Sequence, residues 1–264
     1  MSDYQLRFAG IARLYGVAAL EKFRAAHVCV VGIGGVGSWA AEALARSGIG
    51  TITLIDLDDV CISNINRQLH ALTDTIGQDK VAVMAQRIKA INPDCIVHQV
   101  EDFVTTDNLR QLISSDIDYV VDAIDSIKAK VALLAYCKRN KIKVISTGGA
   151  GGQTDPTQIQ IADLTQTIND PLLAKVRNSL RRDYNYSRNP KRRFGIDCVF
   201  STEQLVYPQP DGSVCQQKTA QVNAEGEVSS MRLDCSGGFG AVTVVTASFG
   251  FAAVSRVLKK LAQS

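Results

Sequence analysis

Residues 27–49 read HVCVVGIGGVGSWAAEALARSGI, and this stretch decides the fold. It begins with Val28–Val31, a short apolar run rich in β-branched residues, which predicts a buried parallel strand. Four glycines then precede a helix rich in alanine, and they are Gly32, Gly34, Gly35 and Gly37. Glycines allow a tight turn close to a ligand, and a helix N-terminus offers free N–H groups to a phosphate. The stretch therefore predicts a nucleotide-binding turn.

The glycine turn alone is typical of proteins that bind NAD or FAD, because Gly32, Gly34 and Gly37 satisfy the dinucleotide pattern. Asp56 ends a second predicted strand at residues 51–56, where a ribose-binding carboxylate is expected. The alternative for Asp56 is an ordinary turn residue at the end of a strand.

The residues after the second strand indicate a ligand with more negative charge. They read SNINRQ at 63–68 and GQDK at 77–80, and so add Arg67 and Lys80 to the same turn. A dinucleotide carries only a diphosphate, which the glycine turn already serves. An arginine fork and a lysine point charge fit a triphosphate better.

Five motifs occur in a fixed order, and they are GIGGVGS, LIDLD, SNINRQ, GQDK and VVDAIDS. Together they resemble the nucleotide-binding domain of the ubiquitin-activating-type, or ThiF-like, adenylating enzymes, over about residues 5–150. The resemblance implies an α/β fold with a Rossmann-like, mostly parallel sheet, helices on both faces, and a homodimer.

The resemblance also implies an ATP site. Its nucleotide-binding residues would be Gly34, Gly35, Gly37, Asp56, Asp58, Asn66, Arg67, Gln68 and Lys80. Arg67 would stabilise the charge that grows on the phosphates, and Lys80, at a predicted helix start, would be catalytic. The alternative for Lys80 is a surface charge.

The segment VVDAIDS ends a further predicted strand, where ligands of a parallel sheet collect. The family pattern is Asp-x-x-Asp-Asn, and its second acid helps to hold Mg²⁺. Asp125 occupies that position, while Ser126 replaces the asparagine. Asp125 with phosphate oxygens and waters would form an oxygen-rich shell, although helix N-capping is the alternative.

Residues 5–24 are predicted to form short helices. In the family this arm supplies an arginine to the ATP phosphates of the neighbouring subunit. Arg7-Phe8 matches only the first half of the family pattern, so Arg13, about one helical turn further, is expected to act in trans. The alternative is a solvated face on a packing helix.

The chain length of 264 residues suits one large α/β unit with an appended lobe. We expect a nucleotide-binding half at 1–152, with its N-terminal arm. A substrate-facing half at 153–264 would continue the same sheet, with a mobile loop at 207–230 and a C-terminal helix. The glycine-dense run 147–152 either approaches the substrate carboxylate or is a plain hinge.

A basic run lies between residues 175 and 193, although the net charge of the whole chain is only +3. It is either a solvated face or a surface for the phosphate backbone and bases of RNA. We favour RNA contact by Arg181, Arg182, Lys191, Arg192 and Arg193.

Seven cysteines form no CxxC pair, and their odd number argues for reduced thiols in a cytoplasmic protein without a zinc site. Cys198, Cys215 and Cys235 are either buried thiols or transfer nucleophiles, and Cys235 lies near Arg232. Residues 235–255 carry no charge and have the length of a membrane span. Their glycine, serine and threonine content favours a core helix instead.

Segments such as RFAGIARLYG, RRFGIDCVFSTE and DCSGGFGA resemble a bacterial branch of the superfamily that acts on tRNA. The implied reaction is ATP-dependent dehydration, through carboxylate adenylation, of threonylcarbamoyladenosine beside the anticodon to its cyclic form. The alternatives are adenylation of a small protein's C-terminus with thiol transfer, or a redox or scaffold protein. The resemblance also implies a possible monovalent cation and a possible cysteine desulfurase or sulfur-acceptor partner.

Overall fold

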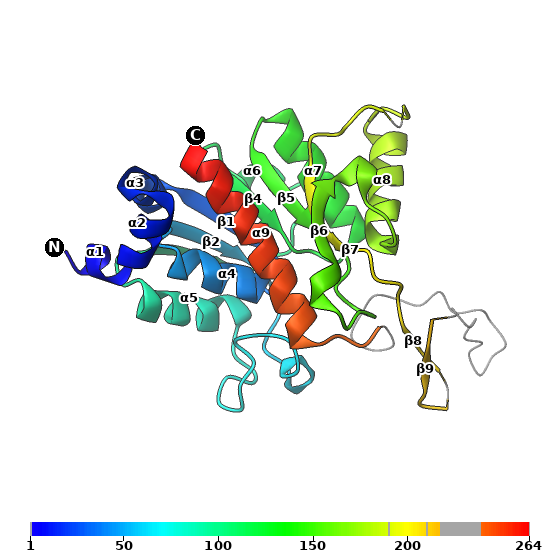
Figure 1. Ribbon diagram of the computed structural model, residues 1–264, viewed down its shortest axis with the longest axis horizontal. Helices are drawn as coiled ribbons and strands as arrows, with labels where there is room; N and C mark the ends of the chain where they lie inside the picture. Colours follow the sequence, from blue (N-terminus) through cyan, green and yellow to red (C-terminus); the bar gives the residue numbers. More distant parts are fainter. Residues whose placement is uncertain (1, 190, 210, 217–238, 264) are drawn as a thin grey trace.

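The computed structural model describes residues 2–189, 191–209, 211–216 and 239–263. Within them, seven strands form one sheet in the order β3-β2-β1-β4-β5-β7-β6 (Figure 1). The strands are β1 (His27–Val31), β2 (Thr51–Ile55), β3 (Ile96–Val100), β4 (Tyr119–Asp122), β5 (Lys143–Thr147), β6 (Ile159–Asp163) and β7 (Asp197–Ser201). Neighbouring strands are parallel except for β6, which pairs antiparallel with β7. This arrangement confirms the predicted α/β class with a mostly parallel sheet.

Helices cover both faces of the sheet (Figure 1). They are α1 (Asp3–Arg7), α2 (Ala9–Tyr15), α3 (Val17–Ala25), α4 (Gly37–Arg46), α5 (Lys80–Ile91), α6 (Leu109–Leu112), α7 (Ile127–Arg139), α8 (Pro171–Asp183) and α9 (Thr243–Gln263). Helices α3, α4, α5 and α9 share one apolar core with the sheet, and α6, α7 and α8 share the other.

The apolar run that predicts β1 works because both faces of this strand are covered. Val28 and Val30 point into the core with α4 and α9, while Cys29 and Val31 point into the core with α7. Alternation along a strand sends successive side chains to opposite faces, so a strand covered twice must be apolar throughout.

From Thr243 onward, the uncharged C-terminal run belongs to the packed helix α9 (Thr243–Gln263), as we expected. Val245, Phe249 and Val257 are fully buried, and the helix packs against α3 and α4. Among the described residues, none of the helices combines the length and apolar character that crossing a bilayer requires.

The second half of the chain extends the sheet through β6 and β7. The antiparallel direction of β6 had no sequence signal that we recognised. Residues 207–216, which we expected to be a loop, include a small hairpin of β8 (Tyr207–Pro208) and β9 (Val214–Cys215). The rest of the expected mobile loop, and Cys235, lie outside the described residues. The division at residue 152 and the homodimer stay predictions.

Candidate active site

A large cleft lies where the strand order reverses, between the carboxyl ends of β1 and β4. From β1 the chain runs outward to β2 and β3, whereas β4, β5 and β7 extend the sheet the other way. Such a reversal separates the loops on either side and leaves a crevice for ligands. The cleft encloses about 1310 Å³ and is lined by the glycine turn, residues 61–68 and residues 123–126.

The glycine turn depends on two positions where a side chain would collide with backbone. Gly32 has φ +86°, and a Cβ there would press on the carbonyl of Ala123 at the end of β4. A Cβ at Gly37 would overlap the carbonyl oxygen of Gly32. Gly34 and Gly35 line the cleft directly, as the sequence predicts. The backbone can therefore turn sharply and open the N-terminus of α4 toward a ligand.

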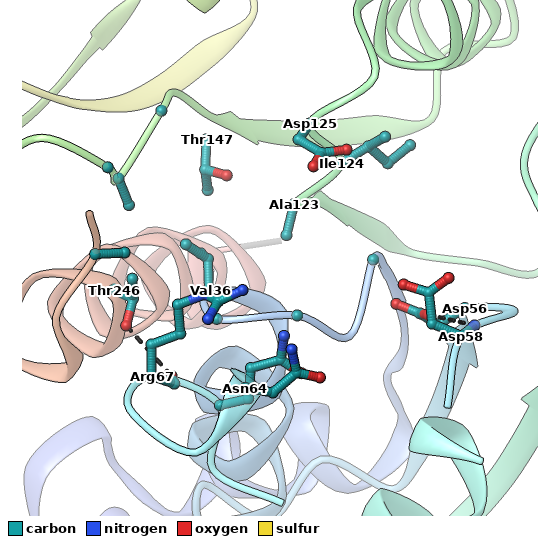
Figure 2. A pocket seen from close by; sticks show the side chains of 18 of the residues that line it. Val36, Asp56, Asp58, Asn64, Arg67, Ala123, Ile124, Asp125, Thr147 and Thr246 are labelled. Carbon is teal, nitrogen blue, oxygen red and sulfur yellow. Dashed lines mark hydrogen bonds between the residues drawn. The ribbon is translucent and has the colours of Figure 1, made fainter. Parts of the chain in front are cut away.

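Asp56, Asp58 and Lys80 form one charged group at the end of β2. The Nζ of Lys80 lies 2.7 Å from Oδ2 of Asp58 and 3.8 Å from Oδ1 of Asp56. The Asp56 carboxylate also accepts hydrogen bonds from the backbone N–H groups of Ile33 (2.6 Å) and Asp58 (2.9 Å). Figure 2 shows both aspartates on the same side of the cleft. Each carboxylate oxygen can accept more than one hydrogen bond, so Asp56 can still bind ribose hydroxyls.

Burial shifts the pKa values of Asp56 and of the nearby His70. It raises the pKa of Asp56, although Lys80 and two backbone N–H groups oppose the effect. His70, which the sequence analysis did not single out, is 1% exposed. Burial, together with the Lys80 charge, lowers the pKa of His70 to about 4. The imidazole of His70 is therefore neutral near pH 7, so Lys80 and not His70 is the cation beside Asp56 and Asp58.

Arg67 projects into the cleft beside the glycine turn (Figure 2). Its guanidinium donates to the carbonyl of Ser63 (2.8 Å) and to Oδ1 of Asn66 (3.0 Å). The Arg67 carbonyl accepts from the indole N–H of Trp39 at 3.1 Å. These bonds hold the Arg67 backbone and one nitrogen of its guanidinium in place at the cleft.

Asn66 and Gln68 also line the cleft, but they are held differently. The side-chain amide of Asn66 donates to the backbone carbonyl of Ala241, and the backbone carbonyl of Asn66 accepts from the Thr243 hydroxyl. Asn66 therefore ties the loop to the start of α9. The Oε1 atom of Gln68 is buried and has no hydrogen-bond partner among the described residues. This acceptor fits a donor group of a bound ligand.

The two aspartates of VVDAIDS have separate environments. Asp122 is fully buried, where its carboxylate accepts from Lys130 (2.8 Å) and from the Ser146 hydroxyl (2.6 Å). Asp125 is exposed and lies in the cleft (Figure 2). The N-cap of α7 is Ser126, so Asp125 is not the capping residue.

The far wall of the cleft is the glycine-dense run after β5. Thr147 and residues 148–151 line the cleft, and the N–H of Gly149 donates to the Asp170 carboxylate at 3.0 Å. Gly152 is bonded to both Val206 and Gly240, which brings two later segments to the same wall. The run therefore lies at the ligand space and also anchors the second half of the chain.

The remaining predicted site residues lie elsewhere. Arg13 is exposed on α2 and does not line the cleft of its own chain. Exposed positions of the basic run include Arg182 and 191–193, and Arg182 pairs with Asp183 at 2.7 Å. Arg181 is half-buried, with its guanidinium 5.6 Å from the ring centre of Phe194.

Five of the described cysteines are free thiols, and they are Cys29, Cys61, Cys95, Cys137 and Cys198. Cys198 is fully buried, and burial raises its pKa well above the ordinary range, so it is an ordinary core thiol. Cys215 is half-buried, whereas Cys61 is exposed and lines the cleft, which the sequence analysis did not anticipate. Among the described residues, no group of three or more histidine, cysteine, aspartate and glutamate side chains is arranged to hold a metal ion.

This fold and cleft define a ThiF-like adenylating protein, and the chain belongs to the ThiF family, which matches residues 6–264. Among its relatives, tRNA threonylcarbamoyladenosine dehydratase of Escherichia coli is 61% identical over 258 residues, covering 98% of this chain and 94% of the relative. The Bacillus subtilis protein of the same name is 44% identical over 196 residues, which is 74% of each chain.

Solved structures give the same result. The crystal structure of E. coli tRNA N6-threonylcarbamoyladenosine dehydratase, TcdA, in complex with ATP superposes with a TM-score of 0.86 at 56% identity. That similarity covers 98% of this chain and 96% of the other. A complex of the same protein with AMP also has a TM-score of 0.86, at 57% identity.

Proposed function

We propose that this protein uses ATP to dehydrate threonylcarbamoyladenosine in tRNA to the cyclic form, through an acyl-adenylate. The supporting observation is that Arg67, Lys80 and Asp125 meet around the glycine turn, in a chain 61% identical to a protein named for that reaction. The place of action would be the cytoplasm, where tRNA is found.

The chemistry requires activation of a carboxylate, which is a poor electrophile because its leaving group would be oxide. The threonyl carboxylate attacks the α-phosphorus of ATP, which forms the acyl-adenylate and releases pyrophosphate. The neighbouring carbamoyl group then attacks the activated carbonyl, closes the ring and displaces AMP. This second step is intramolecular, so it needs positioning more than an enzyme nucleophile.

Lys80 and Arg67 supply positive charge to the phosphates. Lys80 is almost fully buried, yet its partner Asp58 is 57% exposed at the side chain. A triphosphate in the cleft would compete with Asp58 for the ammonium group, while Asp56 would remain as a second carboxylate 3.8 Å from it. Charge aimed where the reaction develops negative charge is the strongest single contribution to catalysis that such a site can make.

Asp125 is the residue that would hold Mg²⁺. Its carboxylate is exposed in the cleft, and one carboxylate with phosphate oxygens and waters is a usual Mg²⁺ environment. The ion would neutralise phosphate charge when bound. Around it, Thr147 and the backbone of the glycine-dense run would orient the substrate carboxylate.

A homodimer would complete the site with Arg13. Leu14 and Val17 beside Arg13 are 75% and 68% exposed, and Leu6 is 61% exposed. On α9, Val244 and Phe251 are also exposed. Apolar surface of this kind marks a partner surface, and a second copy of this chain is the occupant that would bring Arg13 to a cleft.

The tRNA surface would be the exposed part of the basic run, with Arg182 and residues 191–193 on phosphates. Arg181 contributes partly buried charge beside them. The tyrosines of this run, Tyr184 and Tyr186, pack against the core instead of forming an open stacking surface. A cysteine desulfurase or sulfur-acceptor partner and a monovalent cation stay predictions.

Nucleoside mass spectrometry tests the reaction. Purified protein is incubated with ATP, Mg²⁺ and tRNA that carries threonylcarbamoyladenosine, and loss of one water from that nucleoside is expected. Lys80→Ala should lower the rate by roughly 10²- to 10³-fold, because a preorganised charge is lost. Lys89→Ala on the same helix is the matched control and should retain activity.

ATP–pyrophosphate exchange separates both adenylating functions from a redox or scaffold protein, and the state of the tRNA then separates the two adenylating functions. Exchange without any change in the tRNA would reject the tRNA substrate and favour a small protein's C-terminal carboxylate. In that case a covalent adduct on Cys61, Cys215 or Cys235 should be sought by mass spectrometry of the intact protein.

A further inference from the structure

A second, smaller cavity adjoins the cleft. It encloses about 380 Å³, within the size range of pockets that bind small organic groups, and shares Pro171 and Leu205 with the cleft wall. Its other lining residues are polar or aromatic for the most part, including Asn169, Arg177 and Tyr207. The reaction proposed above uses none of them.

An aromatic pair separates the two cavities. Tyr207 lines the smaller cavity and Phe239 lines the cleft, with their ring centres 5.1 Å apart at an angle of 51°. Their backbones are held together through Gly152, whose N–H donates to Gly240 and whose carbonyl accepts from Val206. A side chain at Gly152 would collide with the Phe239 ring. The pair is therefore a built feature of the wall.

The cavity also contains unused hydrogen-bonding capacity. The hydrogen bonds of Arg177 all run from one nitrogen, Nη1, to Leu164 and Thr167. Its Nε and Nη2 atoms donate to no group among the described residues, and Arg177 lines the cavity, so these donors are available to a ligand. The exposed amide of Gln204 has no hydrogen-bond partner among the described residues. Asp170 also lines the cavity, but its carboxylate is occupied by the N–H groups of Gly149 and Leu173.

The cavity lies along α8, on the way from the cleft to the basic run. Residues 170, 171, 174 and 177 line it, and Arg181 follows four residues later on the same side of the helix. A polyanion bound along the basic run would pass this cavity before entering the cleft. A planar aromatic ring, an arginine and a free amide are the groups that bind a nucleobase and its phosphate.

We propose that this cavity, between Tyr207, Arg177 and Gln204, binds the nucleotide next to the modified adenosine in the same RNA strand. The inference rests on the proposed tRNA substrate and adds a second subsite to it. The base would stack on Tyr207, the adjoining phosphodiester would contact Arg177, and Gln204 would contact the base edge.

Steady-state kinetics on tRNA and on short RNA probes tests the subsite. The variants are Tyr207→Ala, Tyr207→Phe and Gln204→Glu, with Gln111→Glu on α6 as the matched control for added charge. One probe is the modified adenosine as a 5′-monophosphate, and the other is a trinucleotide that adds its two neighbours. ATP affinity, measured separately, reports whether the fold and the cleft remain intact.

The wild-type protein should prefer the trinucleotide over the monophosphate. Tyr207→Ala should remove that preference and reduce kcat/KM for tRNA by roughly tenfold, mainly through KM, while Tyr207→Phe retains both. Gln204→Glu should weaken tRNA use more than Gln111→Glu does. Equal use of both probes by the wild type, or unchanged tRNA kinetics in both Tyr207→Ala and Gln204→Glu, would overturn the subsite. If wild-type protein fails to dehydrate tRNA at all, the proposed function itself has failed.

Discussion

Lys80 and Lys130 are both buried lysines, but their partners assign them different uses. Lys80 pairs with Asp58, whose side chain is largely exposed at the cleft. Lys130 pairs with Asp122, and both side chains are fully buried below the cleft floor. A charge whose partner is exposed can exchange it for a ligand, whereas a fully enclosed pair cannot be rearranged without exposing unpaired charge.

Lys130→Met should therefore destabilise the protein without acting on the chemistry. The change leaves the Asp122 carboxylate buried without its counter-ion, at a cost of about 3–5 kcal/mol. Urea denaturation measures the free energy of unfolding, with Lys128→Met on the same helix as an exposed control. The double variant Asp122→Asn with Lys130→Met should recover part of the lost stability. Equal stability of Lys130→Met and its control Lys128→Met would contradict this account.

At the scale of elements, α4 is placed by its first glycine and by one glutamate. The glycine turn lets α4 pack against one face of β1. The Glu42 carboxylate on α4 accepts hydrogen bonds from Arg46 on the same helix and from Arg87 on α5. Glu42 is 5% exposed. Burial alone would raise the pKa of Glu42, but the hydrogen bonds from Arg87 and Arg46 outweigh it and the pKa is lowered.

Gly37→Ala should disturb the turn between β1 and α4. The new methyl group would overlap the Gly32 carbonyl, and such overpacking costs about 1–3 kcal/mol. Thermal unfolding and calorimetric ATP binding should both weaken. Gly10→Ala on α2, where a Cβ meets open space, should instead stabilise the helix by about 0.5–1 kcal/mol. Normal ATP affinity in Gly37→Ala would show that the turn tolerates the methyl group.

Glu42→Gln should lower stability in a pH-dependent way. The pKa of Glu42 is lower in the folded protein than in the unfolded chain, where it is about 4.3, so ionised Glu42 stabilises the fold above that pH. This stability is lost as the pH falls through the pKa of the folded state. We expect a loss of about 1 kcal/mol at pH 7, since both arginines are partly exposed, and a vanishing difference from wild type in acid. Urea denaturation at pH 7 and below pH 4 measures it, with exposed Glu101→Gln as the control.

At the scale of the whole molecule, the cleft contains Arg67, Lys80 and Asp125 but not Arg13. Residues 2–25 form helices at the amino ends of the strands, opposite the cleft. They lie next to the C-terminal ends of α4 and α5. An arginine placed there reaches a phosphate only in another subunit. The proposed role of Arg13 therefore requires the proposed homodimer, and one experiment can test both.

Mixing two inactive variants tests the shared site. Arg13→Ala and Lys80→Ala should each be inactive alone, whereas a hybrid dimer contains one site with both residues intact. After equal mixing and subunit exchange, about a quarter of wild-type activity is expected. Lys89→Ala, mixed in place of Lys80→Ala, controls for the mixing procedure and should give about half of wild-type activity whether or not subunits exchange. No recovery in a mixture shown by mass measurement to contain hybrids would exclude Arg13 as a trans-acting residue.

The sequence by itself determined the parallel half of the fold and most of the cleft. Local patterns were sufficient for β1, the glycine turn and the start of α5 at Lys80, because each depends on residues adjacent in the chain. Motif order also gave the family, since five linked segments constrain one another. Asp56, Arg67 and Asp125 followed from that order.

Only the tertiary structure decided which charges face the ligand. Asp122 and Asp125 are three residues apart, yet one is enclosed with Lys130 and the other lies open in the cleft. Likewise Cys61 is exposed while Cys198 is buried, and Tyr207 contacts Phe239 although 31 residues separate them in the sequence. Burial and long-range contact depend on how distant segments pack, and no local pattern records that packing.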